Sequence, residues 1–327
     1  MHIVTGGAGF IGSNIVRALI DRGYQDVVVV DELSNGHKFA NISDLNIADY
    51  LDKDEFIERL AADATFAKSI QAMLHLGACS ETTEWDGRFM MRNNYSYSKT
   101  LLHHCLEYGS QFIYASSAAV YGGSTRFVED PVFENPLNVY GYSKIQFDRY
   151  VRRVAADATS QVVGLRYFNV YGPGEQHKGS MASVAFHFDQ QIQDSGEAKL
   201  FAGTDGYKDG EQVRDFVYID DICDVNLWFL DNPSTSGIYN AGTGKAQSFN
   251  DVANAVIQCH GKGKIRYVPF PEHLVGAYQS FTQADLTELR KTGCDVEFRP
   301  VEDGVRDYLS SDLGRRRNCL SNTTIES

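Results

Sequence analysis

A tyrosine and a lysine stand four residues apart in the segment NVYGYSK, residues 138–144. If this segment is helical, positions i and i+4 share a face, so Tyr140 lies beside Lys144 while Tyr142 faces away. An ammonium next to a phenol favours the phenolate, and we therefore expect Lys144 to lower the pKa of Tyr140. Such a phenol could serve as a general acid or base at neutral pH, although the same spacing also occurs on ordinary packed helices.

A pair of serines ends a predicted strand upstream of this tyrosine. The segment QFIYASS, residues 111–117, is apolar until Ser116 and Ser117. Ligands of open α/β sheets bind at the carboxyl ends of the strands. A serine hydroxyl in that position could hold a substrate oxygen while the tyrosine moves its proton.

Glycines follow the first predicted strand in the segment VTGGAGFIG, residues 4–12. Gly7, Gly9 and Gly12 fit the pattern G-x-G-x-x-G, and Gly6, Gly9 and Gly12 fit a G-x-x-G-x-x-G variant. Small residues between a strand and a helix let a pyrophosphate approach the helix N-terminus, whose N–H groups favour negative charge. The position predicts dinucleotide binding, against the alternative of a glycine-rich turn without a ligand.

The next predicted strand ends in a carboxylate, Asp31, 19 residues after Gly12. A carboxylate at this place usually binds the ribose hydroxyls of NAD. Lys38 and Lys53 follow closely and could balance the 2′-phosphate of NADP, or they could be ordinary surface charges. The residues alone therefore leave NAD and NADP open.

Strands and helices alternate through the first half of the chain. Strands are predicted at residues 2–5, 27–31, 72–78, 111–117 and 162–166, with helices at 11–22, around 87–107 and after Tyr140. Near-continuous apolar strands between helices indicate a parallel sheet covered on both faces, the doubly wound α/β fold of Rossmann type.

The second half is less regular, with Gly-rich polar loops around short predicted helices near 179–194, 219–230 and 248–259. We predict a Rossmann domain at residues 1–170 and a smaller α/β, mainly substrate-binding lobe at 171–310, between which the chain could cross more than once. Residues 311–327 are polar and aperiodic and are predicted to form a frayed tail.

The composition argues against several classes of binding partner. The 327 residues include 30 Lys+Arg and 43 Asp+Glu, a net charge of −13, which argues against broad binding of nucleic acid or anionic membranes. No segment has the apolar length needed to span a bilayer, and the early first strand leaves no room for a signal peptide, so we expect a cytoplasmic protein. Six cysteines without a C-x-x-C pair, and histidines without H-x-x-x-H spacing, predict free thiols and no metal site.

Taken together, four segments resemble the extended short-chain dehydrogenase/reductase family, which includes the NAD-dependent epimerases and dehydratases. They are TGGAGFIG (5–12), SSAAVYG (116–122), YGYSK (140–144) and RDFVYIDD (214–221). The resemblance implies that Ser117, Tyr140 and Lys144 are the catalytic set and that Lys144 also holds the nicotinamide ribose.

Within this family, dehydratases carry an acid pair directly after the serine, and Ala118 and Ala119 stand there in this chain. An epimerase or a reductase therefore remains. Segments 45–50, 77–87, 166–187 and 277–286 resemble the members that invert C6 of an ADP-linked heptose for the lipopolysaccharide inner core. That likeness implies a homopentamer, tightly held NADP with Lys38 and Lys53 at its 2′-phosphate, and Lys178 as a second acid/base. Without it, Lys178 would be read as a surface charge.

The resemblance also implies binding residues. The cofactor contacts are expected at Gly6, Gly9, Phe10, Ile11, Gly12, Asp31, Glu32, Lys38, Lys53, Leu76, Gly77, Ala78, Cys79, Ser80, Asn93, Lys144, Val170 and Lys178. The substrate contacts are expected at Asn169, Ser180, His187, Phe201, Ala202, Gly203, Thr204, Arg214 and Tyr278. At Leu76 the family tends to have an acidic residue, so only a backbone contact carries over.

Some of these assignments have alternatives. The guanidinium of Arg214 suits a diphosphate, but it could instead pair with Asp215 or Asp221. His187 could be a buried core histidine. Three other functions compete with the 6-epimerase. They are those of a UDP-hexose 4-epimerase, of a sugar-nucleotide reductase, and of a catalytically silent NAD(P)-binding sensor or scaffold, with NAD as the alternative cofactor. Segment 205–213 is longer and more acidic than in the family.

Overall fold

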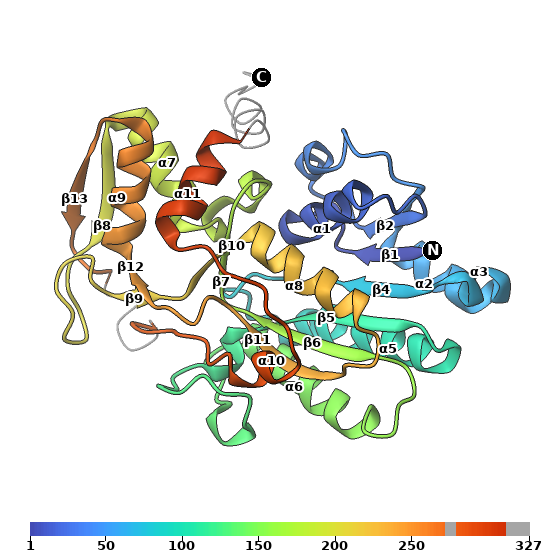
Figure 1. The fold of residues 1–327 in the computed structure, drawn as a ribbon. Helices are drawn as coiled ribbons and strands as arrows, with labels where there is room; N and C mark the ends of the chain where they lie inside the picture. Colours follow the sequence, from blue (N-terminus) through green and yellow to red (C-terminus); the bar gives the residue numbers. More distant parts are fainter. Residues whose placement is uncertain (272–278, 312–327) are drawn as a thin grey trace.

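Seven parallel strands form the central sheet of the computed structural model, which describes residues 1–271 and 279–311 (Figure 1). The strands are β1 (His2–Thr5), β2 (Val27–Asp31), β3 (Asp49–Asp52), β4 (Ala72–His75), β5 (Gln111–Ser117), β6 (Val162–Tyr167) and β11 (Gly237–Ala241). Their order is β11-β6-β5-β4-β1-β2-β3, so the direction of winding reverses between β1 and β4. The predicted doubly wound parallel sheet is confirmed, and the reversal marks the place where such sheets bind ligands.

Helices cover both faces of this sheet (Figure 1). On one face α1 (Phe10–Asp21) packs beside α8 (Ile219–Asp231), and on the other α5 (Tyr97–Tyr108) and α6 (Val139–Val154) pack against β5. The remaining helices of the first half are η1 (Gly36–Asn41), α2 (Lys53–Ala62), α3 (Ala64–Ser69), α4 (Gly87–Met90), the π-helix η2 (Met91–Ser96), η3 (Ala118–Tyr121) and η4 (Pro131–Phe133).

The strands are apolar at successive positions because both sides of the sheet are buried. Val4, Leu74 and Ile113 belong to the core beneath α1 and α8. Their neighbours Ile3, Met73 and Phe112 belong to the core on the opposite face, beneath α5 and α6. A strand buried on both faces needs no polar alternation, which explains the continuous apolar runs in the sequence.

The second lobe is built on three two-stranded ribbons. They pair β7 (Asn169–Tyr171) with β10 (Phe216–Tyr218), β8 (Glu197–Phe201) with β13 (Lys264–Val268), and β9 (Val213–Arg214) with β12 (Gln247–Ser248). The other elements of the second half are η5 (Gln176–Met181), α7 (Val184–Ser195), α9 (Phe249–His260), α10 (Thr287–Lys291) and α11 (Val301–Ser310). Between these ribbons the chain returns to the central sheet to add β11, so the lobes are not consecutive in sequence.

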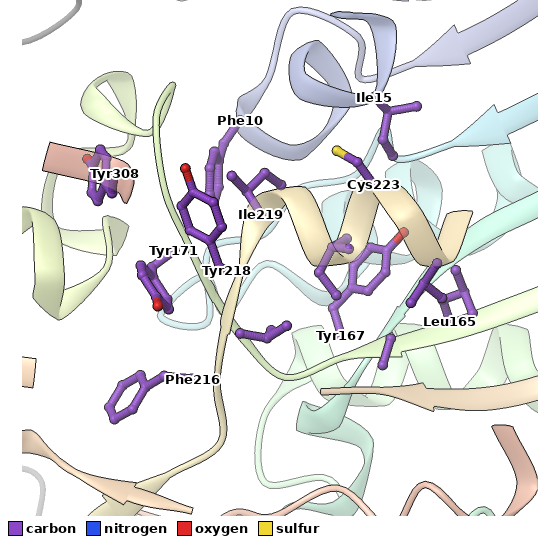
Figure 2. Packing of buried hydrophobic residues seen from close by; sticks show 14 of the residues in the cluster. Phe10, Ile15, Leu165, Tyr167, Tyr171, Phe216, Tyr218, Ile219, Cys223 and Tyr308 are labelled. Atoms are coloured by element: carbon purple, nitrogen blue, oxygen red, sulfur yellow. The ribbon is translucent and has the colours of Figure 1, made fainter. Parts of the chain in front are cut away.

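A continuous aromatic and aliphatic core joins the sheet to the second lobe. Figure 2 shows Leu165 and Tyr167 of β6 lying below α8, with Tyr218 and Tyr171 continuing the cluster towards the second lobe. Tyr308 of α11, also buried, completes it. The two lobes therefore share one core.

Some predicted boundaries were wrong. The predicted strand 72–78 ends at His75, and the predicted helix 87–107 is interrupted by the π-helix η2. The helix predicted near 179–194 begins only at Val184, after the 3₁₀ turn η5, because Ser183 caps it by accepting a hydrogen bond from the N–H of Phe186. The polar tail predicted at 311–327 lies, after its first residue, outside the described part of the chain.

A buried ion cluster fastens α6 to β6. The fully buried Arg166 guanidinium donates hydrogen bonds to Asp148 at 2.9 Å and to Glu134. Asp148 also accepts hydrogen bonds from the hydroxyls of Tyr114 and Ser116, each at 3.0 Å. All charges in this cluster are paired, which is the condition for tolerating them in the interior.

Replacing Arg166 with methionine should therefore lower the free energy of unfolding by about 3–5 kcal/mol, because it leaves two buried carboxylates without their main cation. Urea unfolding measures this loss. Arg306→Met is the matched control, because Arg306 pairs with Asp303 on the surface, with 62% and 45% of the side chains exposed. It should cost less than about 1 kcal/mol, and equal losses in the two variants would contradict the role given to the cluster.

Candidate active site

The glycine loop between β1 and α1 forms the floor of the site. Gly6 has a φ of +66°, and a Cβ on Gly12 would lie 2.1 Å from the carbonyl oxygen of Gly6, so neither position accepts a side chain without strain. Gly9 precedes α1 without a side-chain cap, and the first turn of the helix holds no acidic residue. The N–H groups of that turn therefore fit a pyrophosphate, as a dinucleotide requires.

The carboxyl end of β2 carries two carboxylate–lysine pairs. Asp31 is buried and accepts hydrogen bonds from the N–H of Ala8 at 2.8 Å and from Lys38 Nζ at 2.9 Å. Lys53 pairs with Glu32 and lowers the pKa of that carboxyl. Both lysines thus lie where β2 ends, and each is balanced by a carboxylate.

A cavity of about 590 Å³ runs from these pairs across the carboxyl ends of the strands to α6. It is large enough to hold a cofactor or small ligand. Every residue predicted to contact the cofactor lines it: Gly6, Gly9, Phe10, Ile11, Gly12, Asp31, Glu32, Lys38, Lys53, Leu76, Gly77, Ala78, Cys79, Ser80, Asn93, Lys144, Val170 and Lys178. Ser117 and Tyr140 line the same cavity, so the structure brings together residues that are up to 172 positions apart.

Ser117, Tyr140 and Lys144 meet where β5 ends against α6. Tyr140 is hydrogen-bonded to Ser117, whose Oγ also accepts from the N–H of Ala119 at 3.1 Å. Lys144 Nζ donates to the carbonyl oxygen of Ala115 at 2.8 Å and lies 6.0 Å from the centre of the Tyr140 ring. Tyr142 is 45% exposed and points away, as the helical spacing predicts.

The expected lowering of the Tyr140 pKa was wrong. Burial raises the pKa of Tyr140, although the hydrogen bond from Ser117 opposes this shift. Burial lowers the pKa of Lys144 to about 8, and the nearby Asp148 carboxylate opposes that change. The Lys144 ammonium donates to the backbone of β5, and the buried phenol of Tyr140 holds its proton in this arrangement.

Lys178 approaches the same cavity from the second lobe. It lies in η5, and its Nζ is 5.4 Å from the centre of the Phe10 ring in the glycine loop. Burial lowers the pKa of Lys178, while the charge of Glu175 opposes this effect. An amine with a lowered pKa exchanges protons more readily near neutrality than a surface lysine does.

The residues predicted to bind the substrate are spread over several elements of the second half of the chain. Asn169 and Ser180 are exposed, His187 on α7 is partly buried, and Phe201 ends β8, followed by Ala202, Gly203 and Thr204. The described members of this set are not among the residues that line the cavity. Tyr278 lies outside the described residues.

Arg214 is buried on β9, where its guanidinium lies over the ring of Phe249. The two carboxylates considered as its ion-pair partners have other contacts: Asp221 pairs with Arg299, and Asp215 accepts from the N–H groups of Thr243, Gly244 and Ala284.

Several cavity-lining residues were not predicted. Glu81, Thr82, Glu84 and Phe89 follow β4, and His177 precedes Lys178. The polar run after β4 sits at the carboxyl end of a parallel strand, and that position is a signal that could have found the first three.

A buried histidine supports the floor of the cavity. His75 at the end of β4 bonds through Nδ1 to Thr5 Oγ1 at 2.6 Å and through Nε2 to Ser98 Oγ at 2.7 Å. Burial, with a smaller effect of Lys144, lowers the pKa of His75 from 6.5 to about 3. The imidazole is therefore neutral in the folded chain.

This shift predicts a loss of stability in acid. Below pH 6.5 the unfolded chain protonates this histidine while the folded chain does not until the pH nears 3, so His75 costs stability across that window. The cost approaches about 1.4 kcal/mol per pH unit. Urea unfolding at several pH values should give a shallower pH dependence for His75→Gln than for the wild type, and equal slopes would contradict the assignment.

Among the described residues, no helix is long and apolar enough to cross a membrane. No group of three or more His, Cys, Asp or Glu side chains in the same part of the chain is placed to hold a metal ion.

The fold and the cleft place the chain in a known class. The NAD dependent epimerase/dehydratase family matches residues 2–242, and the chain belongs to this family.

Individual relatives are more specific. A protein of Alkalilimnicola ehrlichii named ADP-L-glycero-D-manno-heptose-6-epimerase is 60% identical over 311 residues, which are 95% of this chain and 97% of the relative. The crystal structure of the Helicobacter pylori enzyme of the same name has a TM-score of 0.82 at 31% identity, covering 94% of this chain and 95% of its own. A Thermus thermophilus UDP-glucose 4-epimerase, solved with NAD, has a TM-score of 0.76 at 28% identity, covering 96% and 99%.

Proposed function

We propose that this chain is an isomerase that interconverts ADP-D-glycero-β-D-manno-heptose and ADP-L-glycero-β-D-manno-heptose in the cytoplasm, for the heptose of the lipopolysaccharide inner core. The observation that carries the proposal is one cavity lined both by Ser117, Tyr140 and Lys144 of the sheet lobe and by Lys178 of the other lobe. The 60% identity to a protein of that name, over almost the full length of both chains, supports the choice of sugar.

The bound nicotinamide supplies a reversible acceptor for the C6 hydride of the heptose. Ser117 would hold the C6 oxygen by a hydrogen bond. Tyr140, bonded to Ser117, first releases its own proton to solvent; its phenolate then takes the C6 hydroxyl proton as the hydride leaves, and it returns that proton when the carbonyl is reduced. The positive charge of Lys144 near the Tyr140 ring stabilises the phenolate that exists before it takes up the C6 hydroxyl proton.

Inversion requires the C6 carbonyl to present its other face before the hydride returns. After rotation about the exocyclic bond, the oxygen no longer lies against Tyr140. Lys178 enters the cavity from the other lobe and carries the proton for that orientation. Each face of the 6-keto sugar therefore has its own proton-handling group.

The proposed cofactor is tightly bound NADP. Lys38 and Lys53 line the ribose end of the cavity, where their ammonium groups could meet a 2′-phosphate. Each is already paired with a carboxylate, Asp31 or Glu32, so these lysines offset the negative charge that would otherwise repel the phosphate. With NAD, the alternative, Asp31 would bind the ribose hydroxyls instead.

The remaining assignments belong to the same proposal. Arg214 and the segment 201–204 would hold the ADP-sugar from the second lobe, together with Asn169, Ser180, His187 and Tyr278. A homopentamer is the proposed assembly.

Epimerisation without added cofactor tests the proposal. Purified chain incubated with ADP-D-glycero-β-D-manno-heptose should form the C6 epimer, followed by proton NMR, until the two epimers reach equilibrium. Failure to form the epimer would reject the proposed function. Denaturing the same preparation should release NADP, whereas released NAD would reject the cofactor assignment alone.

The structural likeness to a UDP-glucose 4-epimerase with NAD supports one rival, a UDP-hexose 4-epimerase. Parallel incubations with UDP-glucose should leave that substrate unchanged. Conversion to UDP-galactose at a rate equal to that of the heptose substrate would favour the rival.

A further inference from the structure

The segment that carries Lys178 is fastened to the glycine loop by two asparagines. We refer to residues 172–183, between β7 and α7, as the Lys178 loop. Asn14 of α1 donates through Nδ2 to the carbonyl of Phe10 at 2.9 Å and to that of Pro173 at 2.8 Å. Asn41, at the end of η1, donates through Nδ2 to the carbonyl of Ala8 at 3.0 Å and to that of Gly174 at 3.1 Å.

The two side-chain amides therefore form two parallel bridges between the first lobe and the Lys178 loop. Each joins one carbonyl from the start of α1 or the glycine loop to one of two consecutive carbonyls in the Lys178 loop. Both side chains are buried, Asn41 completely. Gln176 adds a hydrogen bond from its Nε2 to Oδ1 of Asn41 at 3.1 Å.

The Lys178 loop is also closed on itself. The buried carboxylate of Glu175 accepts hydrogen bonds from the N–H of Gly172 at 3.3 Å and from the Oγ of Ser183 at 2.7 Å. Glu175 thus ties the two ends of the loop together. A loop closed in this way shifts as a unit, so its attachment to the first lobe decides where Lys178 lies.

A displacement of the loop would break several of these bonds together. Moving it away from α1 would remove the hydrogen-bond donors of the Pro173 and Gly174 carbonyls and one of the carbonyl acceptors of each buried amide. Buried polar groups that lose their partners are costly, so this arrangement resists displacement. Lys178 follows Gly174 by four residues, so its position depends on where the loop is attached.

We propose that Asn14 and Asn41 are positioning residues that fix Lys178 relative to the backbone that binds the dinucleotide pyrophosphate. The inference rests on the proposed function for the part played by Lys178. The glycine loop then sets two positions, that of the hydride acceptor and that of the second proton-handling group. A small misplacement of a reacting group is enough to lower a rate by about 100-fold, so such registration is a direct contribution to catalysis.

The variants Asn14→Ala and Asn41→Ala test the inference in the protein as purified with its nucleotide. The control is Asn240→Ala, because Asn240 is also completely buried and its Nδ2 also donates to two carbonyls, those of Phe127 and Asp285. Its contacts lie away from the Lys178 loop. The control therefore measures the loss of stability that follows from removing any buried amide that bridges two carbonyls.

Hydrogen–deuterium exchange of residues 172–183 provides a readout that needs no turnover. We expect Asn41→Ala to speed exchange in this segment, while β5 and α6 stay as protected as in the wild type and the nucleotide content is unchanged. The Asn240→Ala control should not speed exchange there. Exchange in 172–183 that equals that of the control would overturn the inference, whatever the wild-type activity proves to be.

The kinetic arm separates positioning from stability. We expect Asn41→Ala to lower kcat by about 10- to 100-fold at a nearly unchanged KM, and Asn240→Ala to leave both constants near the wild type. In Asn41→Asp a protonated carboxyl can donate one hydrogen bond, so the rate relative to wild type should rise as the pH falls, and Asn41→Ala should show no such recovery. A kcat equal to that of the control in a wild type that epimerises would reject the inference and leave the proposed function standing.

Discussion

Replacing Tyr140 with phenylalanine is expected to lower kcat for epimerisation by about 10²- to 10⁴-fold, the usual contribution of a positioned general acid or base. The phenylalanine ring keeps the packing on α6, and only the hydroxyl that bonds to Ser117 is lost. That hydroxyl is the group that, as a phenolate, takes the C6 hydroxyl proton and returns it when the carbonyl is reduced. Initial rates measured by NMR or chromatography of the two epimers check the result.

The matched control is Tyr142→Phe, two residues along the same helix but 45% exposed. It should leave kcat and KM unchanged. A Tyr140→Phe variant that turns over as fast as Tyr142→Phe would mean that the phenol moves no proton. No turnover in the wild type and in both variants would favour the alternative of a catalytically silent nucleotide-binding protein.

Replacing Lys178 with methionine should lower kcat by a similar amount, about 10²- to 10⁴-fold. The side chain reaches the cavity that Tyr140 lines, and burial lowers the pKa of its amine. Without it the second orientation of the sugar carbonyl has no proton donor, although Tyr140 still serves the first. The bound substrate should therefore still be oxidised at C6, while reduction of the rotated carbonyl is slow. Reduced nucleotide should accumulate, and its near-ultraviolet absorbance measures this.

Lys178→Arg distinguishes proton transfer from charge. Arginine keeps the positive charge but does not give up its proton in proteins, so this variant should be almost as slow as Lys178→Met. Lys199→Met, on an exposed position of β8, controls for the loss of a lysine and should be as fast as the wild type. Full activity of Lys178→Arg would assign Lys178 an electrostatic role only.

The local parts of the site could be predicted from the sequence. The glycine loop lies between a strand and a helix only a few residues apart, so its geometry follows from the chain itself. Tyr140 and Lys144 are one helical turn apart, and α6 begins at Val139 with Asn138 accepting a hydrogen bond from the N–H of Gly141 as its cap. Both features depend on contacts within a dozen residues.

Other features depend on contacts that the sequence does not display. The Lys144 ammonium donates to the Ala115 carbonyl 29 residues away. Burial by tertiary packing overturned the pKa expected for Tyr140 from helical spacing. The bridge from Asn41 to Gly174 spans 133 residues. Neither Asn41 nor Asn14 carries a charge or belongs to a motif that would have singled it out.

The return of β11 to the central sheet is a third case. Residues 237–241 are short and only partly apolar, so they give no strand signal of their own. Their pairing with β6 depends on α8 packing across the sheet beside α1. Tertiary packing therefore decides that the chain leaves the first lobe and comes back.

The central claim is that C6 is inverted by a hydride that leaves and returns within one cavity, with Tyr140 and Lys178 handling only the hydroxyl proton. Epimerisation carried to equilibrium in D₂O, with the product analysed by mass spectrometry and NMR at C6, tests it most directly. The account predicts that the epimer forms with no deuterium bound to C6. Deuterium at C6 would show that the carbon itself exchanges a proton with a base, and it would contradict the account.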